Sequence, residues 1–213
     1  MAIEAVESLS PVSQSHTSYR QPHHFYLPVD RLQFKEGTLV DLLRTIGRLP
    51  LLPIVVCCST RDVLDAVSYA VANLSHISTA SLYSDLSLAE RASVLENFRE
   101  ATMKWNQMGT IRSEGDSEET VTIEEQKSHM IVVTDACLPL ITCGESPITA
   151  RLLINYELPT KKETYMRRMT TCLAADGIVI NMLVEGEMMT LKGIEQSSGL
   201  VISEMPINIL EML

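Results

Sequence analysis

The stretch IVVCCSTRDVLDAVSYAV, residues 54–71, determines the fold class because it joins a strand directly to a helix. Its first five residues are Ile, Val and Cys, the composition of a strand that is buried on both faces. Cys57 and Cys58 are adjacent in that strand and should point to opposite faces of a sheet. Ser59 or Thr60 can cap the helix that follows. The apolar stripe of this helix consists of Val63, Leu64, Val67 and Val71.

The same alternation of strand and helix continues on both sides of this stretch. Further strands are predicted at HFYLPVD (24–30), TASLYSD (79–85), MIVVTD (130–135), LLINYEL (152–158) and GIVINMLV (177–184). Helices are predicted at about 37–47, 88–101, from near 162, and 187–195. Strands that alternate with helices form a mostly parallel, doubly wound sheet with helices on both faces. The sequence therefore predicts an α/β protein with a single domain.

Two helical segments carry more specific expectations. Ser87 and Glu90 form a capping box that opens the helix at 88–101. Its core-facing residues are predicted to be Leu88, Ala92, Leu95 and Phe98. The segment MPINILEML (205–213) is predicted to close the chain as a short helix packed through Ile207, Leu210 and Leu213.

Composition places the chain among soluble globular proteins. Of its 213 residues, 46% are hydrophobic and 21% are charged, and no apolar run reaches the roughly 18 residues of a membrane span. The first residues show no secretory signal, so we expect a protein of the nucleus or the cytoplasm. Five cysteines without CxxC spacing, and histidines without metal-ligand spacing, predict neither a disulfide framework nor a bound metal.

The charge balance disfavours general binding to nucleic acid. Seventeen basic and 27 acidic residues give a net charge of −10. Most nucleic-acid binding depends on attraction between basic side chains and phosphates, which this balance opposes. A local basic patch remains compatible with the composition.

Two segments do not fit the alternating pattern. Residues 1–22 are rich in Ser, Pro, Gln and His, and we interpret them as a disordered arm that precedes the domain at 23–213. Residues at about 104–129 are acidic and contain Gly and Ser, so we predict a mobile surface insertion. This insertion is either an inert solvated loop or a segment for partner docking or regulation.

Several segments together resemble the C-terminal RecA-like domain of DEAD-box RNA helicases, most closely the translation initiation factor 4A group. The matching segments, in order, are IVVCCST (54–60), SDLSLAERASVLENFR (84–99), TD (134–135), LLINYELP (152–159) and LKGIEQSSGLVISEMPINILEML (191–213). The similarity covers roughly residues 24–213. It implies a RecA-like fold and the absence of the first RecA-like lobe, for which one chain of this length is too short.

The resemblance breaks at the residues that catalysis requires. In the family, the helix after the INYDLP strand carries HRxGRxxR, whose last two arginines reach the γ-phosphate of ATP. Such arginine fingers contribute about 10³–10⁵ in rate in phosphoryl-transfer enzymes. Here Arg167 and Arg168 occupy the first two positions, whereas Thr171 and Ala174 replace the fingers on a helix predicted to contain them.

Other family residues are also replaced. The ARGxD segment after Thr134 and Asp135 becomes LPLIT (138–142), followed by a few extra residues, and Leu88 replaces the glutamine of the QxxR pattern. No GxxxxGK[ST] loop and no DEAD-type carboxylate cluster occurs in the 213 residues. We therefore expect no catalytic residue, no bound cofactor and no ATP hydrolysis by this chain alone.

The remaining polar residues have a functional and a structural interpretation. The resemblance implies that Thr134 contacts RNA phosphate, that Asp135 orders the loops around it and that Arg91 helps to hold RNA. Ser59, Thr60 and Arg61 lie at the corresponding edge and can donate to phosphate. Alternatively, Ser59 and Thr60 only cap a helix, and Asp135 only pairs with an arginine such as Arg167 or Arg168.

Three functions remain open from the sequence. The first is a non-catalytic adaptor that acts through protein–protein contacts in RNA processing or translation-related assemblies. The second is a weak RNA-binding module, and the third is a helicase or ATPase subunit that acts in trans. A RecA-like lobe without its mate exposes the face that the mate would cover, so a protein partner or a homodimer is predicted there. No membrane contact is expected.

Overall fold

The structure is a computed structural model that describes residues 21–113 and 126–213, with the side chains of 109–113 left aside. The predicted arm lies outside the described residues except for its last two positions. Residues 114–125 of the predicted insertion also lie outside them.

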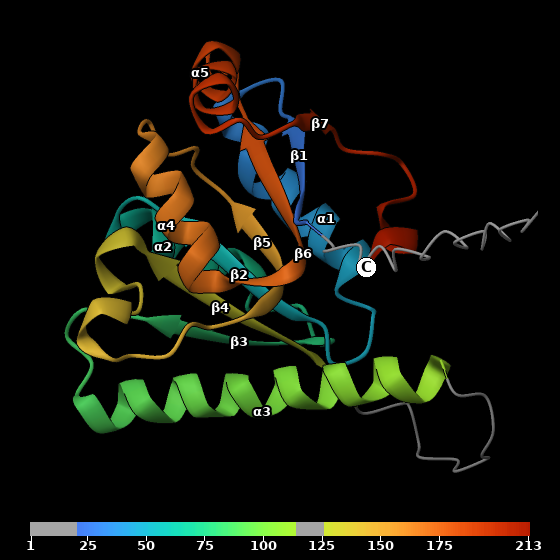
Figure 1. Cartoon of the computed structure of the whole chain (residues 1–213), viewed down its shortest axis with the longest axis vertical. Coiled ribbons are helices and arrows are strands. Elements are labelled where there is room, and N and C mark those ends of the chain that lie inside the picture. Colours follow the sequence, from blue (N-terminus) through green and yellow to red (C-terminus); the bar gives the residue numbers. More distant parts are fainter. Residues whose placement is uncertain (1–20, 114–125) are drawn as a thin grey trace, which may run out of the picture.

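The described residues form one parallel sheet of seven strands in the order β3-β4-β2-β5-β6-β1-β7 (Figure 1). The strands are β1 (His23–Pro28), β2 (Pro53–Cys58), β3 (Ile77–Leu82), β4 (Ser128–Thr134), β5 (Ala150–Asn155), β6 (Leu173–Leu183) and β7 (Ile202–Glu204). All neighbouring strands pair in parallel. The predicted α/β class and parallel sheet are therefore confirmed.

Five α-helices cover the two faces of this sheet. They are α1 (Lys35–Ile46), α2 (Arg61–Val71), α3 (Leu88–Ser113), α4 (Lys162–Cys172) and α5 (Met188–Ser198). Helices α1 and α2 pack on one face, with Cys58, and helices α3, α4 and α5 pack on the other, with Cys57. Figure 1 shows α4 in front of the sheet and α1 and α2 behind it. The predicted opposite orientation of the two cysteines is thus confirmed, and the sheet is doubly wound.

Helix α3 begins as predicted and extends further than predicted. The capping box is present, because Ser87 N donates to Glu90 Oε2 at 2.9 Å and Glu90 N donates to Ser87 Oγ at 3.2 Å. The helix ends at Ser113 rather than at residue 101. Helix-favouring residues and the partly buried Trp105 continue the helix, so the first part of the predicted insertion is helical.

The predicted inner face of α3 was wrong at its first turn. Leu88 is 87% exposed and Ala92 is exposed, whereas Leu95 and Phe98 are buried as expected. The apolar residues that face the sheet come after the first turn, because this turn extends beyond the neighbouring strand ends towards solvent.

The last part of the chain also differs from the prediction. The short strand β7 was not predicted, and it pairs with β1 through Ile202 and Ser203. The chain ends in a 3₁₀ turn, Ile209–Met212, whose buried residue is Ile209. Ile207 is fully exposed, so the predicted packing through this residue was wrong. Among the described helices, none is long and apolar enough to cross a membrane.

Candidate functional site

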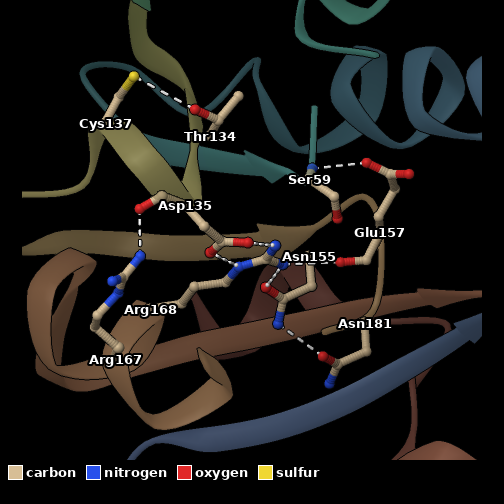
Figure 2. A network of polar contacts seen from close by, with 9 residues as sticks. All are labelled: Ser59, Thr134, Asp135, Cys137, Asn155, Glu157, Arg167, Arg168 and Asn181. Carbon is tan, nitrogen blue, oxygen red and sulfur yellow. Dashed lines mark hydrogen bonds and ion pairs between the residues drawn. The ribbon is translucent and has the colours of Figure 1, made fainter. Parts of the chain in front are cut away.

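The predicted site residues gather where neighbouring parallel strands end, which we call the carboxyl edge. Ser59 follows β2, Asp135 follows β4, and Glu157 lies two residues beyond β5. These three strands are neighbours in the sheet, so their ends meet at one place. Figure 2 shows their polar side chains converging on Arg168 of α4.

Arg168 is the centre of this arrangement and is fully buried. Its Nε and Nη2 donate to the two carboxylate oxygens of Asp135, each at 2.7 Å. Its Nη1 donates to the Asn155 Oδ1 at 2.9 Å and to the Glu157 carbonyl oxygen at 2.8 Å (Figure 2). Burial opposes the charge of the guanidinium, but the hydrogen bonds to Asp135 outweigh it, and the pKa of Arg168 is raised. This arginine is therefore a saturated structural ion pair.

A chain of buried hydrogen bonds leads from Arg168 across the sheet to His24. Asn155 Nδ2 donates to Asn181 Oδ1 at 2.8 Å, and Asn181 Nδ2 donates to the Tyr165 hydroxyl at 3.2 Å. The Tyr165 hydroxyl lies 2.9 Å from His24 Nδ1. Arginine can only donate, so it fixes the direction of every later bond. Tyr165 consequently donates to Nδ1, and the proton of a neutral His24 is on Nε2.

His24 ends the chain without a further partner. Its Nε2 is buried and, among the described residues, has no hydrogen-bond partner. Burial, and then the neighbouring His23, lower the pKa of His24 to about 4. The imidazole is therefore neutral at physiological pH.

A second arginine, Arg91 of α3, is engaged at the outer part of the carboxyl edge. Its Nε and Nη2 donate to the two carboxylate oxygens of Glu145 at 3.3 and 3.2 Å. Its Nη1 donates to the Cys137 carbonyl oxygen at 3.0 Å. Glu145 belongs to the extra residues that interrupt the family pattern, and the sequence gave no signal for this contact.

The other predicted donors at this edge are also occupied. Thr60 Oγ1 accepts from Val63 N at 3.3 Å, so it caps α2 as one interpretation expected. Ser59 N donates to a Glu157 carboxylate oxygen at 2.7 Å. Arg61 Nη1 lies 3.0 Å from an Asp85 carboxylate oxygen, and the side-chain hydrogen bond lowers the pKa of Asp85.

Thr134 and Arg167 make weaker or more exposed contacts. Thr134 Oγ1 donates to the Cys137 Sγ at 3.4 Å, and Thr134 is 8% exposed. Arg167 donates to the main-chain oxygen of Asp135 while its side chain is otherwise exposed. The alternative in which Asp135 binds these two arginines is therefore the arrangement that the structure has.

The two positions that replace the arginine fingers do not lie on the same element. Thr171 is buried on α4 and its hydroxyl donates to the Arg167 carbonyl oxygen at 2.6 Å. Helix α4 ends at Cys172, and Ala174 lies on β6. The expected continuous helix over 167–177 was wrong, because Leu173 takes an extended conformation and pairs with Ala150.

Within the described residues, no group of three or more His, Cys, Asp or Glu side chains is placed to hold a metal ion. No protein-family model matches the chain. The ATP-dependent RNA helicase eIF4A of Candida glabrata is 27% identical over 187 residues, which are 87% of this chain and 39% of that protein. Eukaryotic initiation factor 4A of Drosophila melanogaster is 25% identical over 191 residues, 89% of this chain and 39% of that protein. The chain thus spans about two fifths of the length of these relatives.

Solved structures locate the similarity within such proteins. The C-terminal domain of the DEAD-box protein Dbp5 superposes with a TM-score of 0.60 at 17% identity, covering 91% of this chain and 99% of that domain. The E. coli DEAD-box protein SrmB bound to regulator of ribonuclease activity A has a TM-score of 0.61 at 17% identity, covering 89% of this chain and 94% of that chain. The fold is therefore that of a RecA-like domain. The protein is a helicase-like domain similar to the C-terminal domain of DEAD-box RNA helicases, as the sequence resemblance implied.

Proposed function

We propose that this chain is a non-catalytic adaptor that acts through protein–protein contacts in RNA-processing or translation-related assemblies of the nucleus or cytoplasm. One observation carries the proposal. Arg61, Arg91 and Arg168 at the carboxyl edge are each paired with a carboxylate of the chain itself. Arginines that are already paired are poor ligands for RNA phosphate, whereas the framework that could present a protein surface is intact.

Exposed apolar side chains at the same edge support a protein partner. Leu88, Leu140 and Ile141 are 87%, 55% and 45% exposed. They stand where the resemblance implies polar residues that hold RNA. Apolar residues rimmed by paired charges are typical of protein interfaces. The proposed partner surface is therefore the face that a first RecA-like lobe would cover, and a second copy of the chain is one candidate to occupy it.

Similar domains provide precedents for protein partners. The S. cerevisiae Dbp5 C-terminal domain has been solved bound to Gle1, and SrmB has been solved bound to RraA. Dbp5 has also been solved bound to RNA and ADP-BeF₃. A weak RNA-binding module that uses Ser59, Arg91 and Thr134 is thus the second candidate, and the exposed Arg167 favours it. A subunit that completes an ATPase in trans would lack both arginine fingers.

Affinity purification of the tagged chain from its own cells, with and without RNase, tests the proposal. We expect a defined set of proteins to remain after RNase, because the contacts are between proteins. Loss of the whole set after RNase would contradict the adaptor and support the RNA-binding module. A matched variant, Leu140→Gln with Ile141→Gln, should reduce the retained set while the similarly exposed Tyr69→Gln on α2 should not.

A further inference from the structure

The contact between Arg91 and Glu145 has the geometry of an occupied anion site. The guanidinium of Arg91 presents two N–H groups to both oxygens of one carboxylate. The main-chain N–H of Leu140 donates to the same Glu145 Oε2 at 2.7 Å. A bidentate guanidinium beside a main-chain N–H is also the donor set that binds a phosphate group.

Arg91 is held in place from the rest of the fold, so the site does not depend on Glu145 for its shape. The third N–H direction of Arg91, at Nη1, is fixed by the Cys137 carbonyl oxygen at 3.0 Å. Only 17% of the Arg91 side chain is exposed. A preorganised arginine of this kind loses little rotamer freedom when it binds an anion.

Glu145, in contrast, is held by little besides this contact. It lies in a loop that begins with a 3₁₀ turn, Ile141–Cys143, and contains Gly144 with φ of +87°. Leu140 and Ile141 of the same loop are exposed and add no buried anchor. A shallow hollow of about 560 Å³, lined in part by Leu88, Ser93 and Gly144, adjoins the pair and leaves room for an incoming group.

We propose that Arg91 and the Leu140 N–H form a latent phosphate-binding site, which Glu145 occupies in cis and thereby closes to single-stranded RNA. The hydrogen bond from Arg91, and then the one from Leu140, lower the pKa of Glu145, so its carboxylate is charged at neutral pH. RNA is the ligand that fits because Arg61 follows β2 along the same edge, where a second phosphate of one strand can bind it. This inference stands whether or not the chain is an adaptor.

The test measures binding of a short fluorescein-labelled oligouridylate to the full chain by fluorescence anisotropy at about 50 mM salt. Glu145→Ala should bind about tenfold more tightly than the unaltered chain, the lower range for a charge-assisted hydrogen bond. Its affinity should also fall more steeply with salt, by about 0.7 in the logarithmic slope for one added phosphate contact. Glu145→Gln should give a smaller gain, because its amide still fills the site.

Two variants make the result specific. Asp41→Ala removes one negative charge and releases Arg44 on α1, on the opposite face of the sheet, so it matches the charge change without touching the site. It should bind as the unaltered chain does. The double variant Arg91→Ala, Glu145→Ala should lose the gain. A gain in Asp41→Ala equal to that in Glu145→Ala, or a gain that survives in the double variant, would overturn the inference.

Inorganic phosphate separates a polyanion site from a site for a free anion. Phosphate added to Glu145→Ala at the ionic strength of a chloride control should not displace the oligonucleotide beyond that control. Displacement well beyond the control would assign the site to a small anion instead of RNA. Thermal unfolding of each variant accompanies the titration, and a destabilised Glu145→Ala leaves the comparison of Glu145→Gln with Asp41→Ala to decide.

Discussion

Arg168 and Arg91 lie at the same edge of the sheet, and each donates to both oxygens of one carboxylate, but their surroundings differ. Arg168 is fully buried, and its partner Asp135 directly follows a central strand. Arg91 is partly exposed, and its partner Glu145 comes from a loop whose apolar side chains point to solvent. The same pair of chemical groups thus occurs once in a rigid setting and once in a movable one.

The difference teaches which of the two pairs can have a regulatory role. A buried charge that loses its partner is strongly unfavourable, so the Arg168 pair cannot open while the domain stays folded. An exposed pair contributes little to stability, and solvent or another anion can replace either partner at small cost. The Arg91 pair can therefore change without unfolding, whereas the Arg168 pair holds α4 against the sheet.

The largest effect that separates the two pairs is expected from Arg168→Ala. This change leaves the Asp135 carboxylate and the Asn155 amide oxygen without their buried donor. We expect a loss of about 3–5 kcal/mol in the free energy of unfolding, as for other broken buried pairs. Urea denaturation followed by circular dichroism measures it.

The neighbouring Arg167→Ala is the matched control, because it removes the same side chain from an exposed position on the same helix. Its cost should stay within about 1 kcal/mol. Equal losses in the two variants would mean that the hydrogen bonds of Arg168 do not stabilise the fold, and the contrast with Arg91 would fail.

A second prediction concerns the far end of the hydrogen-bond chain, at His24. An unfolded histidine has a pKa near 6.5, whereas the folded pKa is about 4. Below pH 6.5 the unfolded chain takes up a proton that the folded chain does not, so stability is fully present above this pH. It should fall by up to about 3 kcal/mol as pH decreases towards 4.

His24→Gln tests this prediction because Gln does not titrate in that range. Other groups titrate between pH 4 and 6.5, so the quantity to compare is the difference between variants in urea denaturation. The slope of stability with pH should be clearly smaller in His24→Gln. It should change less in His129→Gln, since His129 is only half-buried, although burial and Lys104 lower its pKa too. Parallel curves for His24→Gln and the unaltered chain would refute the prediction.

The parts of the fold that follow from local chemistry could be predicted from the sequence. The run IVVCC and the capping residues Thr60, Ser87 and Glu90 each act within a few residues, and the structure has the elements that they predict. The short strand β7 was missed because three residues carry no periodicity. The switch from α4 to β6 was missed because pairing of Leu173 with Ala150 decides it, and this partner is distant in sequence.

The site was predictable only where polar residues interrupt a pattern or a family resemblance applies. Asn181 stands in an apolar strand, a signal for a buried hydrogen bond that the sequence analysis did not use. Glu145 gave no signal, because its partner Arg91 lies 54 positions earlier and an exposed glutamate in a loop is ordinary. Sequence reasoning therefore identified the arginines but could not show that the chain itself neutralises them.

The smallest expected effect uses cysteines as reporters of the two regions. Cys143 is exposed in the loop that carries Glu145, whereas the other four cysteines, Cys57, Cys58, Cys137 and Cys172, are buried. The hydrogen bond with Cys172, and then burial, raise the pKa of Cys57, and burial raises the pKa of Cys58 to about 12. With a thiol reagent such as dithionitrobenzoate, one thiol should react quickly and the others only as the domain opens.

The variants then report each region separately. Cys143→Ser should abolish the fast phase, and Arg168→Ala should accelerate the slow phase because it loosens the packing around Cys57. Glu145→Ala should leave the slow phase unchanged, since releasing the Arg91 pair does not open the core. If Glu145→Ala accelerated labelling of the buried thiols as much as Arg168→Ala does, the two pairs would belong to one cooperative unit. The loop could then not move independently of the fold.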